Sequence, residues 1–161
     1  MSIVLQRVDE RLIHGQVVIG WGMRLHVQRF IVVDDELASS DWEQELYEIA
    51  LGEEAEAIFL GVAEAAVQLA EWRADDTISV LLTRSLHTMR RLSDLAEFHG
   101  TEVNLGGIHD APGRCEVASY LHLDDTDRAD IQALIDHGAD VSGRDLPEAR
   151  RVGSDVLLAP R

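Results

Sequence analysis

A histidine lies in a short polar loop near the start of the chain, between an apolar run and the first helical pattern. The apolar run covers residues 3–5, and His14 follows in the loop of residues 9–17. Residues 1–33 contain 4 arginines and only 2 acidic residues, for a net charge of +2, whereas the remaining 128 residues carry −18. The free N–H groups of a helix start also favour anions. This loop is therefore expected to bind an anion, with phosphate as the first candidate.

The residue types around His14 suit phosphoryl transfer. A neutral imidazole is a nucleophile near pH 7, and the N–P bond that it forms can pass its phosphoryl group onward. The Arg11 guanidinium suits a fork-like contact with the phosphoryl oxygens, over which the charge is spread during transfer. Asp9 is expected either to hold one ring N–H of the histidine or to orient Arg11. The main-chain amides of Gly15 and Gln16 lie in the expected first helical turn and are candidates for direct phosphoryl binding.

The same loop resembles the active-site loop of a known family. Residues 7–17 have the sequence Arg-Val-Asp-Glu-Arg-Leu-Ile-His-Gly-Gln-Val. This matches without a gap the pattern R-[IV]-D-[DE]-R-L-I-H-G-Q-V of the IIB components of mannose/fructose/sorbose-type sugar phosphotransferase systems. Residues 103–109, Val-Asn-Leu-Gly-Gly-Ile-His, resemble the family's V-N-[LV]-G-G-[MI]-H segment. Similarity of pattern and order covers almost the whole chain, and these two blocks are its specific part.

The resemblance implies a phosphocarrier. In the family, the histidine at the position of His14 is phosphorylated, and the residues at the positions of Arg11 and Asp9 are implicated in the transfer. A member accepts the phosphoryl group from a phospho-IIA protein or domain and passes it to a sugar held by a IIC/IID membrane permease. The resemblance implies no cofactor and no metal ion. The sequence leaves open whether the chain forms a homo-oligomer.

Short apolar runs alternate with helical patterns along the chain. Runs rich in Ile, Val and Leu predict β-strands at residues 2–8, 28–33, 56–61, 77–82 and 101–106. Helical stripes follow each run, the first formed by Val17, Trp21 and Leu25. The alternation predicts a single α/β domain over residues 1–161, with an open, mainly parallel sheet and helices on both faces.

Two segments break this alternation. Residues 107–123 contain Gly-Gly, Ala-Pro-Gly and two short strand-like runs, which predict a short antiparallel addition at one edge of the sheet. Residues 139–160 predict an edge strand near Val141, followed by a loop with a second strand-like piece at 156–158.

The topology predicts where a ligand binds, because sites in open α/β sheets lie outside the carboxyl ends of the strands. Three such loops cover residues 7–15, 83–85 and 106–110. Thr83 and Ser85 supply hydroxyls to phosphate oxygens. Gly107 follows the fifth strand, and His109 is either a hydrogen-bonding partner of the pocket or a turn residue. We expect these loops to converge on one shallow phosphoryl site around His14.

Composition excludes several classes of protein. The chain has 161 residues, of which 46% are hydrophobic, so it can bury a sizeable core. No apolar run approaches the ~20 residues needed to span a bilayer, and the first residues lack a signal-peptide pattern. We therefore expect a cytoplasmic protein without direct membrane insertion. A net charge of −16 argues against nucleic acid as a partner.

Several local features complete the expectations. The lone Cys115 excludes an internal disulfide and is expected to be a core residue. Ser85 and Thr126 are expected N-caps, and Asp41 with Gln44 resembles a capping box. The tryptophans are expected to pack in the core, at positions 21, 42 and 72. The acidic turn at residues 34–36 can be a Mg²⁺ site but is better explained as an ordinary turn after a strand.

Three interpretations follow. The favoured one is a phosphotransferase component that is loaded on His14 by phospho-IIA and serves a sugar permease. The second keeps the phosphohistidine but uses its state to regulate a partner, with no sugar transported. An unrelated α/β small-molecule enzyme, such as a nucleotide-binding hydrolase, ranks far below, because no glycine-rich phosphate loop follows the first strand.

Overall fold

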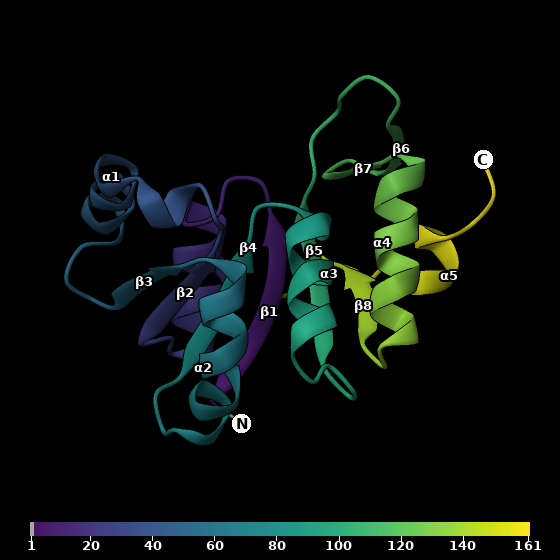
Figure 1. Ribbon diagram of the computed structural model, residues 1–161. Helices are drawn as coiled ribbons and strands as arrows, with labels where there is room; N and C mark the ends of the chain where they lie inside the picture. Colours follow the sequence, from purple (N-terminus) through teal and green to yellow (C-terminus); the bar gives the residue numbers. More distant parts are fainter. Residues whose placement is uncertain (1) are drawn as a thin grey trace.

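A six-stranded parallel sheet forms the centre of the structure, a computed structural model that describes residues 2–161 (Figure 1). Its strand order is β3-β2-β4-β1-β5-β8, and every neighbouring pair is parallel. The strands are β1 (Ile3–Asp9), β2 (Arg29–Val33), β3 (Glu56–Leu60), β4 (Ser79–Thr83), β5 (Glu102–Gly107) and β8 (Asp140–Gly143). All five strands expected from the apolar runs are present, and the expected α/β class is confirmed.

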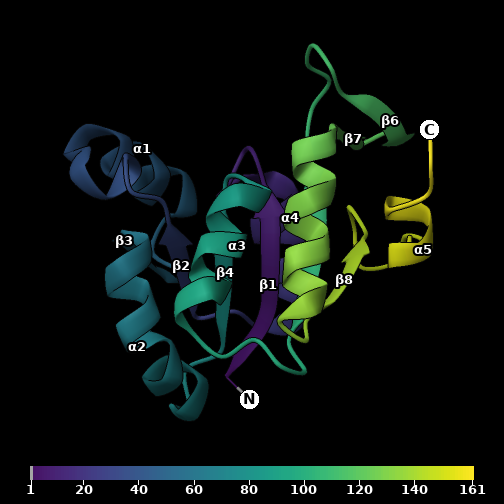
Figure 2. The same ribbon diagram turned by 45° about the vertical axis from the view of Figure 1, so that its right-hand side comes forward.

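Helices cover both faces of the sheet (Figures 1 and 2). One face carries α2 (Val62–Ala74), α3 (Leu86–Leu95) and α4 (Asp125–Asp136). The other carries η1 (Gln16–Met23) and α1 (Asp41–Leu51), with the short 3₁₀ turn η2 (Leu37–Ser39) before α1. Because successive strand residues point to opposite faces, Ile31 and Val33 pack in one core and Phe30 and Val32 in the other.

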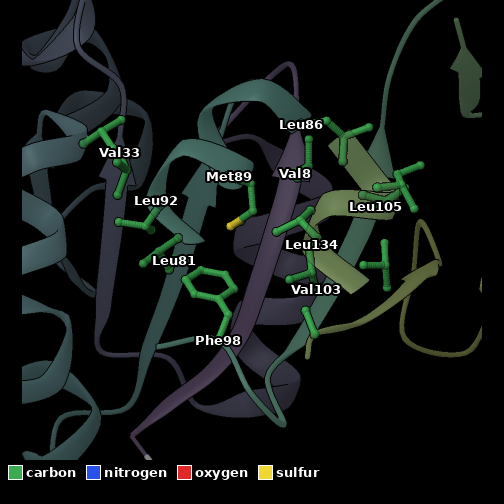
Figure 3. Packing of buried hydrophobic residues seen from close by; sticks show 14 of the residues in the cluster. Val8, Val33, Leu81, Leu86, Met89, Leu92, Phe98, Val103, Leu105 and Leu134 are labelled. Carbon is green, nitrogen blue, oxygen red and sulfur yellow. The ribbon is translucent and has the colours of Figure 1, made fainter. Parts of the chain in front are cut away.

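The larger core lies between the sheet and the helices α3 and α4 (Figure 3). Met89 and Leu92 of α3 point toward Leu81 of β4, and Leu134 of α4 lies over Val103 of β5. Each fully buried side chain of this kind contributes about 1.5–3 kcal/mol of burial free energy. This packing fixes the central strands and hence the loops at their carboxyl ends.

The helix that follows the His14 loop is a π-helix along η1, a wider helix than an α-helix. The stripe that repeats every four residues predicted a helix here but does not distinguish a π-helix from an α-helix. Gly20 and Gly22 permit close packing here. A Cβ at Gly20 would lie 2.8 Å from Leu146 Cδ2, and one at Gly22 would lie 3.2 Å from Phe30 Cζ.

The expected antiparallel addition is present as a two-stranded sheet of β6 (Cys115–Ala118) and β7 (Leu121–Leu123). It is joined to the end of β5 by a bridge between Ile108 and Leu121. Near Val141 the expected edge strand is β8. The strand prediction at residues 156–158 is wrong, because α5 (Ser154–Leu157) forms there. Val152 already pairs with Gly143 on the outer side of β8, so the chain turns away after it.

Two core predictions are wrong. Cys115 is exposed at the start of β6, outside both cores. Trp42 is exposed on α1, whereas Trp21 and Trp72 are buried as expected. Amphipathic spacing alone does not say whether the sheet covers a helix face.

Helix caps are partly as predicted. Ser85 caps α3 by accepting a hydrogen bond from the Thr88 N–H at 3.1 Å. Asp124, and not Thr126, caps α4, where it forms a reciprocal capping box with Asp127. The Asp41–Gln44 box is absent, because the Gln44 amide donates to main-chain carbonyls of the preceding turn at residues 37–38.

Candidate functional site

The loop that carries His14 leaves β1 at the centre of the sheet, between β4 and β5. Leu12 and Ile13 are buried in the smaller core and anchor the loop from below. Leu12 has a φ of +54°, a left-handed conformation that is unusual for a branched residue and marks a strained turn. This turn directs Arg11 and His14 outward on either side of the buried pair.

Asp9 is the centre of the hydrogen-bonding network at this loop and is fully buried. Its Oδ2 lies 2.9 Å from His14 Nε2 and accepts from Arg7 Nη2 at 3.0 Å, while its Oδ1 accepts the Arg11 N–H at 3.0 Å. Burial acts to raise the pKa of Asp9, but the His14 bond, the Arg7 charge and the Arg11 amide outweigh it and hold the pKa below its ordinary value. Asp9 is thus a carboxylate at neutral pH, and both roles expected for it are present in the geometry.

The carboxylate determines which ring nitrogen of His14 is available. An ionised carboxylate only accepts hydrogen bonds, so the Nε2 atom facing Asp9 carries the proton. In the neutral ring Nδ1 then holds the lone pair. The His14 side chain is 15% exposed.

Arg7 supports Asp9 from behind and is fully buried. Its Nη1 donates to Asn104 Oδ1 at 2.7 Å and to the Arg144 carbonyl at 3.0 Å. Its guanidinium also lies 5.6 Å from the centre of the Trp21 ring. Burial lowers the pKa of Arg7 and the Asp9 charge opposes this, but an arginine stays charged in proteins. Arg7 and Asp9 thus form a buried ion pair beneath His14.

The glycine pair at the end of β5 makes room for this ion pair. A Cβ at Gly106 would lie 1.8 Å from Arg7 Cζ, and one at Gly107 would lie 3.1 Å from Asp9 Oδ1. Gly107 is also the register partner of Asp9, and its carbonyl accepts the Glu10 N–H at 2.9 Å. Direct contact between Gly107 and a phosphoryl group stays a prediction.

Arg11 lies on the outer side of the loop and is half-exposed. Its Nη2 donates to Gln16 Oε1 at 2.8 Å, across the first turn of η1. Gly15 has helical dihedral angles just before this turn. The guanidinium therefore contacts the first turn of the helix that follows His14.

The hydroxyls of the β4–α3 loop are engaged locally. Thr83 is buried next to Val8 of β1, and its Oγ1 donates to the Ser85 carbonyl at 3.0 Å. Ser85 Oγ caps α3. Both residues lie in the strand-end loop beside β1, and their contact with phosphoryl oxygens stays a prediction.

His109 is joined to the His14 loop through Glu10. Its Nδ1 lies 2.9 Å from Glu10 Oε2, and its N–H donates to the same oxygen at 3.2 Å. Arg114 donates to the other Glu10 oxygen at 2.8 Å and lies 3.3 Å from an Asp127 oxygen. This cluster fixes the β5–β6 loop against the His14 loop, and a contact between His109 and a phosphoryl group stays a prediction.

Sequence reasoning predicted Asp9 but not the residues that support it. Arg7 and Asp9 lie two apart on one strand and so point to the same face, a signal that could have identified the pair. Glu10 lies in the first motif, residues 7–17, and Asn104 in the second, residues 103–109. The Arg144 carbonyl carried no signal at all, because its place depends on the position of β8 at the sheet edge.

The described residues offer no metal site. No group of three or more His, Cys, Asp or Glu side chains within residues 2–161 has suitable geometry. In the acidic turn, Asp34 accepts the Leu37 N–H at 2.9 Å and Asp35 accepts the Val62 N–H at 2.9 Å. Asp35 also pairs with Arg91, so these carboxylates build the turn.

The chain is similar to known proteins along its length. Residues 3–160 match a family described as the PTS system sorbose subfamily IIB component. The N-acetylgalactosamine-specific phosphotransferase enzyme IIB component 1 of Escherichia coli (strain K12) is 29% identical over 146 residues, which are 91% of this chain and 92% of that protein. The mannose-specific EIIAB component of the same strain is 29% identical over 159 residues, 98% of this chain and 47% of that protein.

Solved structures of IIB components have the same fold as this chain. The crystal structure of the PTS system N-acetylgalactosamine-specific IIB component 1 from Escherichia coli matches with a TM-score of 0.84 and 27% identity, over 93% of this chain and 97% of that one. Within residues 2–161, no helix has both the length and the apolar character required to cross a membrane.

Proposed function

The chain belongs to the sorbose subfamily of phosphotransferase system IIB components, and we propose that His14 Nδ1 is the atom that carries its phosphoryl group. Members of the family are phosphotransferases that work with IIA and IIC/IID components and pass a phosphoryl group from IIA to a sugar. The observation that supports His14 is the 2.9 Å contact between its Nε2 and the buried Asp9 carboxylate. We also place this transfer in the cytoplasm.

The first step is the transfer of the phosphoryl group from IIA to His14. Nδ1 attacks the phosphorus of the phosphohistidine on IIA, so the donor's N–P bond breaks as the new Nδ1–P bond forms. The ring keeps its Nε2 proton and becomes a cationic phosphoimidazolium. The adjacent Asp9 carboxylate offsets this new charge, and Arg7 keeps that carboxylate in place.

In the transfer to the sugar, His14 changes from the acceptor to the donor of the phosphoryl group. A sugar hydroxyl oxygen attacks phosphorus and releases its proton to solvent, the Nδ1–P bond breaks, and the imidazole, which keeps its Nε2 proton, returns to its neutral form. Arg11 turns from Gln16 toward the phosphoryl oxygens and neutralises charge there in both steps. The Gly15 and Gln16 amides complete the oxygen contacts on the same side.

The remaining expected residues border this centre. Thr83 and Ser85 hold the β4–α3 loop beside β1. Gly107 and His109 border the opposite side, at the end of β5.

Phosphorylation with nitrogen-resolved NMR tests the proposal. The protein, uniformly ¹⁵N-labelled, is incubated with the general phosphocarriers, a cognate IIA and phosphoenolpyruvate. We expect one acid-labile, alkali-stable phosphoryl group, with the ¹⁵N shift change at His14 Nδ1 and none in His14→Ala. A label on His109, or on His14 Nε2, would refute the assignment.

A further inference from the structure

The helix α1 leaves its apolar stripe uncovered. Trp42, Leu46 and Ile49 lie at spacings of four and three residues, on one face of the helix. They are 65%, 57% and 70% exposed, whereas Leu51 is the only buried residue of α1. An 11-residue helix with so little burial is marginal by itself, and a large exposed apolar stripe usually marks a contact with another molecule.

A separate apolar groove borders the end of α1, on the side of the helix opposite the stripe. It has a volume of about 320 Å³ and lies between η1 and the end of α1, with Met23, Phe30 and Leu51 in its lining. Met23 at its edge and Ile19 one turn earlier are both exposed. The stripe and the groove lie on the η1 face of the sheet, away from α2, α3 and α4.

The position of α1 connects this surface to the phosphoryl site. Figures 1 and 2 both place α1 at the end of the molecule toward which β1 runs. Glu43 near the start of α1 lies 4.0 Å from Arg84, in the loop after β4. A partner that covers the stripe is therefore held at the same end of the molecule as the His14 loop.

Charge selects the kind of partner. The acidic residues of α1 number four, with no basic residue among them: Asp41, Glu43, Glu45 and Glu48. Two copies of this chain that met through α1 about a twofold axis would bring these acids together, which disfavours a homodimer on this face. Cytoplasmic loops of membrane proteins carry an excess of Lys and Arg. An acidic rim around an apolar stripe complements such loops.

We propose that the α1 stripe is the docking surface for the basic cytoplasmic loops of the IIC/IID permease, an inference that rests on the proposed carrier function. Trp42 inserts into an apolar pocket of the permease, and the surrounding acids pair with its basic loops. Docking there leaves the His14 loop open toward the sugar site.

Binding to the IIC/IID permease in lipid nanodiscs tests this surface, with empty nanodiscs of the same lipid as the blank. Replacement of Trp42, Leu46 and Ile49 together by Gln is expected to weaken binding about 10-fold or more, because apolar anchors carry most of such an interface. The matched control is Val67→Gln, since Val67 is 81% exposed on α2, on the other face. Thermal unfolding of the triple variant should match wild type, because the replaced side chains are exposed.

Charge reversal gives an independent measurement. Glu45→Arg with Glu48→Arg should weaken binding at low salt and less at high salt, whereas Glu64→Arg on α2 should not. Equal permease binding by wild type and both α1 variants would overturn the docking surface. So would a loss of loading by phospho-IIA, or of self-association, with permease binding intact.

The loading assay separates the two proposals. If the α1 variants load His14 at the wild-type rate but lose permease binding, both stand. If wild type itself takes no phosphoryl group on His14, the carrier proposal fails, and with it the reason to expect a permease here.

Discussion

Two histidines of this molecule face a carboxylate at the same distance, yet their surroundings differ. His14 Nε2 lies 2.9 Å from Asp9, and His109 Nδ1 lies 2.9 Å from Glu10. The first histidine is 15% exposed over a fully buried carboxylate, whereas the second is 56% exposed over a partly exposed one. A charge placed in a buried, preorganised setting acts far more strongly than one screened by water. Contact distance alone therefore does not distinguish a reactive pair from one that fastens two loops.

The supports of the two carboxylates differ in the same way. Asp9 is held by the buried Arg7, which is itself fixed by Asn104 and the Arg144 carbonyl. Glu10 is held by Arg114 near the surface. We infer that burial and support, more than pairing, favour His14 over His109 as the proposed phosphoryl acceptor.

The largest expected effect comes from removal of the Asp9 charge. Asp9→Asn should slow loading from phospho-IIA by about 100–1000-fold, since one electrostatic stabiliser of the transition state is lost. Glu10→Gln, the matched change at the other pair, should change the rate by less than about threefold, as exposed pairs contribute little. Rapid-quench measurement of phosphoryl loading checks both. Equal losses in the two variants would remove the distinction between the pairs.

Replacement of arginine by lysine sharpens the comparison on the cationic side. Arg11→Lys should fold normally, because the side chain is half-exposed, but transfer about 10–1000-fold more slowly, because the bidentate fork is lost. Arg114→Lys beside Glu10 should transfer at close to the wild-type rate. Single-turnover rates and the unfolding temperature are the readouts. Near-normal transfer by Arg11→Lys would limit that residue to a structural role.

The glycine pair tests the support of Asp9 through stability. Gly106→Ala should destabilise the fold by about 1–3 kcal/mol or more, because its Cβ would fall on the buried Arg7 guanidinium. Gly15→Ala meets no atom within 4 Å and has helical dihedral angles, so its free energy of unfolding should not fall. Denaturant titration measures both. A stable Gly106→Ala protein with unchanged loading would show that the ion pair can rearrange freely.

The smallest effect is expected in acid. The pKa of Asp9 in the folded protein is below its ordinary value of 3.8, so its contribution to stability is complete above that pH and is lost as the pH falls below 3.8 toward the folded value. Asp9→Asn lacks this contribution. The difference in unfolding free energy between wild type and Asp9→Asn should therefore shrink on acidification below pH 3.8. A difference that stays constant with pH would contradict the lowered pKa.

Local sequence determined the elements and the loops that carry the chemistry. Apolar runs long enough for one strand each specified the five strands, and Ser85 specified the start of α3. The grouping of residues 7–15, 83–85 and 106–110 at the carboxyl ends of the strands followed from the parallel topology. These features depend on neighbouring residues in the chain or on the direction of the strands. Both can be inferred from the periodicity of the apolar residues.

The tertiary structure decided how the site is supported. Arg7 meets Asn104 and the Arg144 carbonyl, 97 and 137 residues away, because β1, β5 and β8 are adjacent in the sheet. Strand order also explains why Gly106 lacks a side chain, a role that the spacing of glycines did not indicate. Trp42 has the same amphipathic pattern as a core residue, and only the folded chain shows that nothing within the described residues covers it. Burial and long-range partners arise when the elements assemble, so no local pattern could specify them.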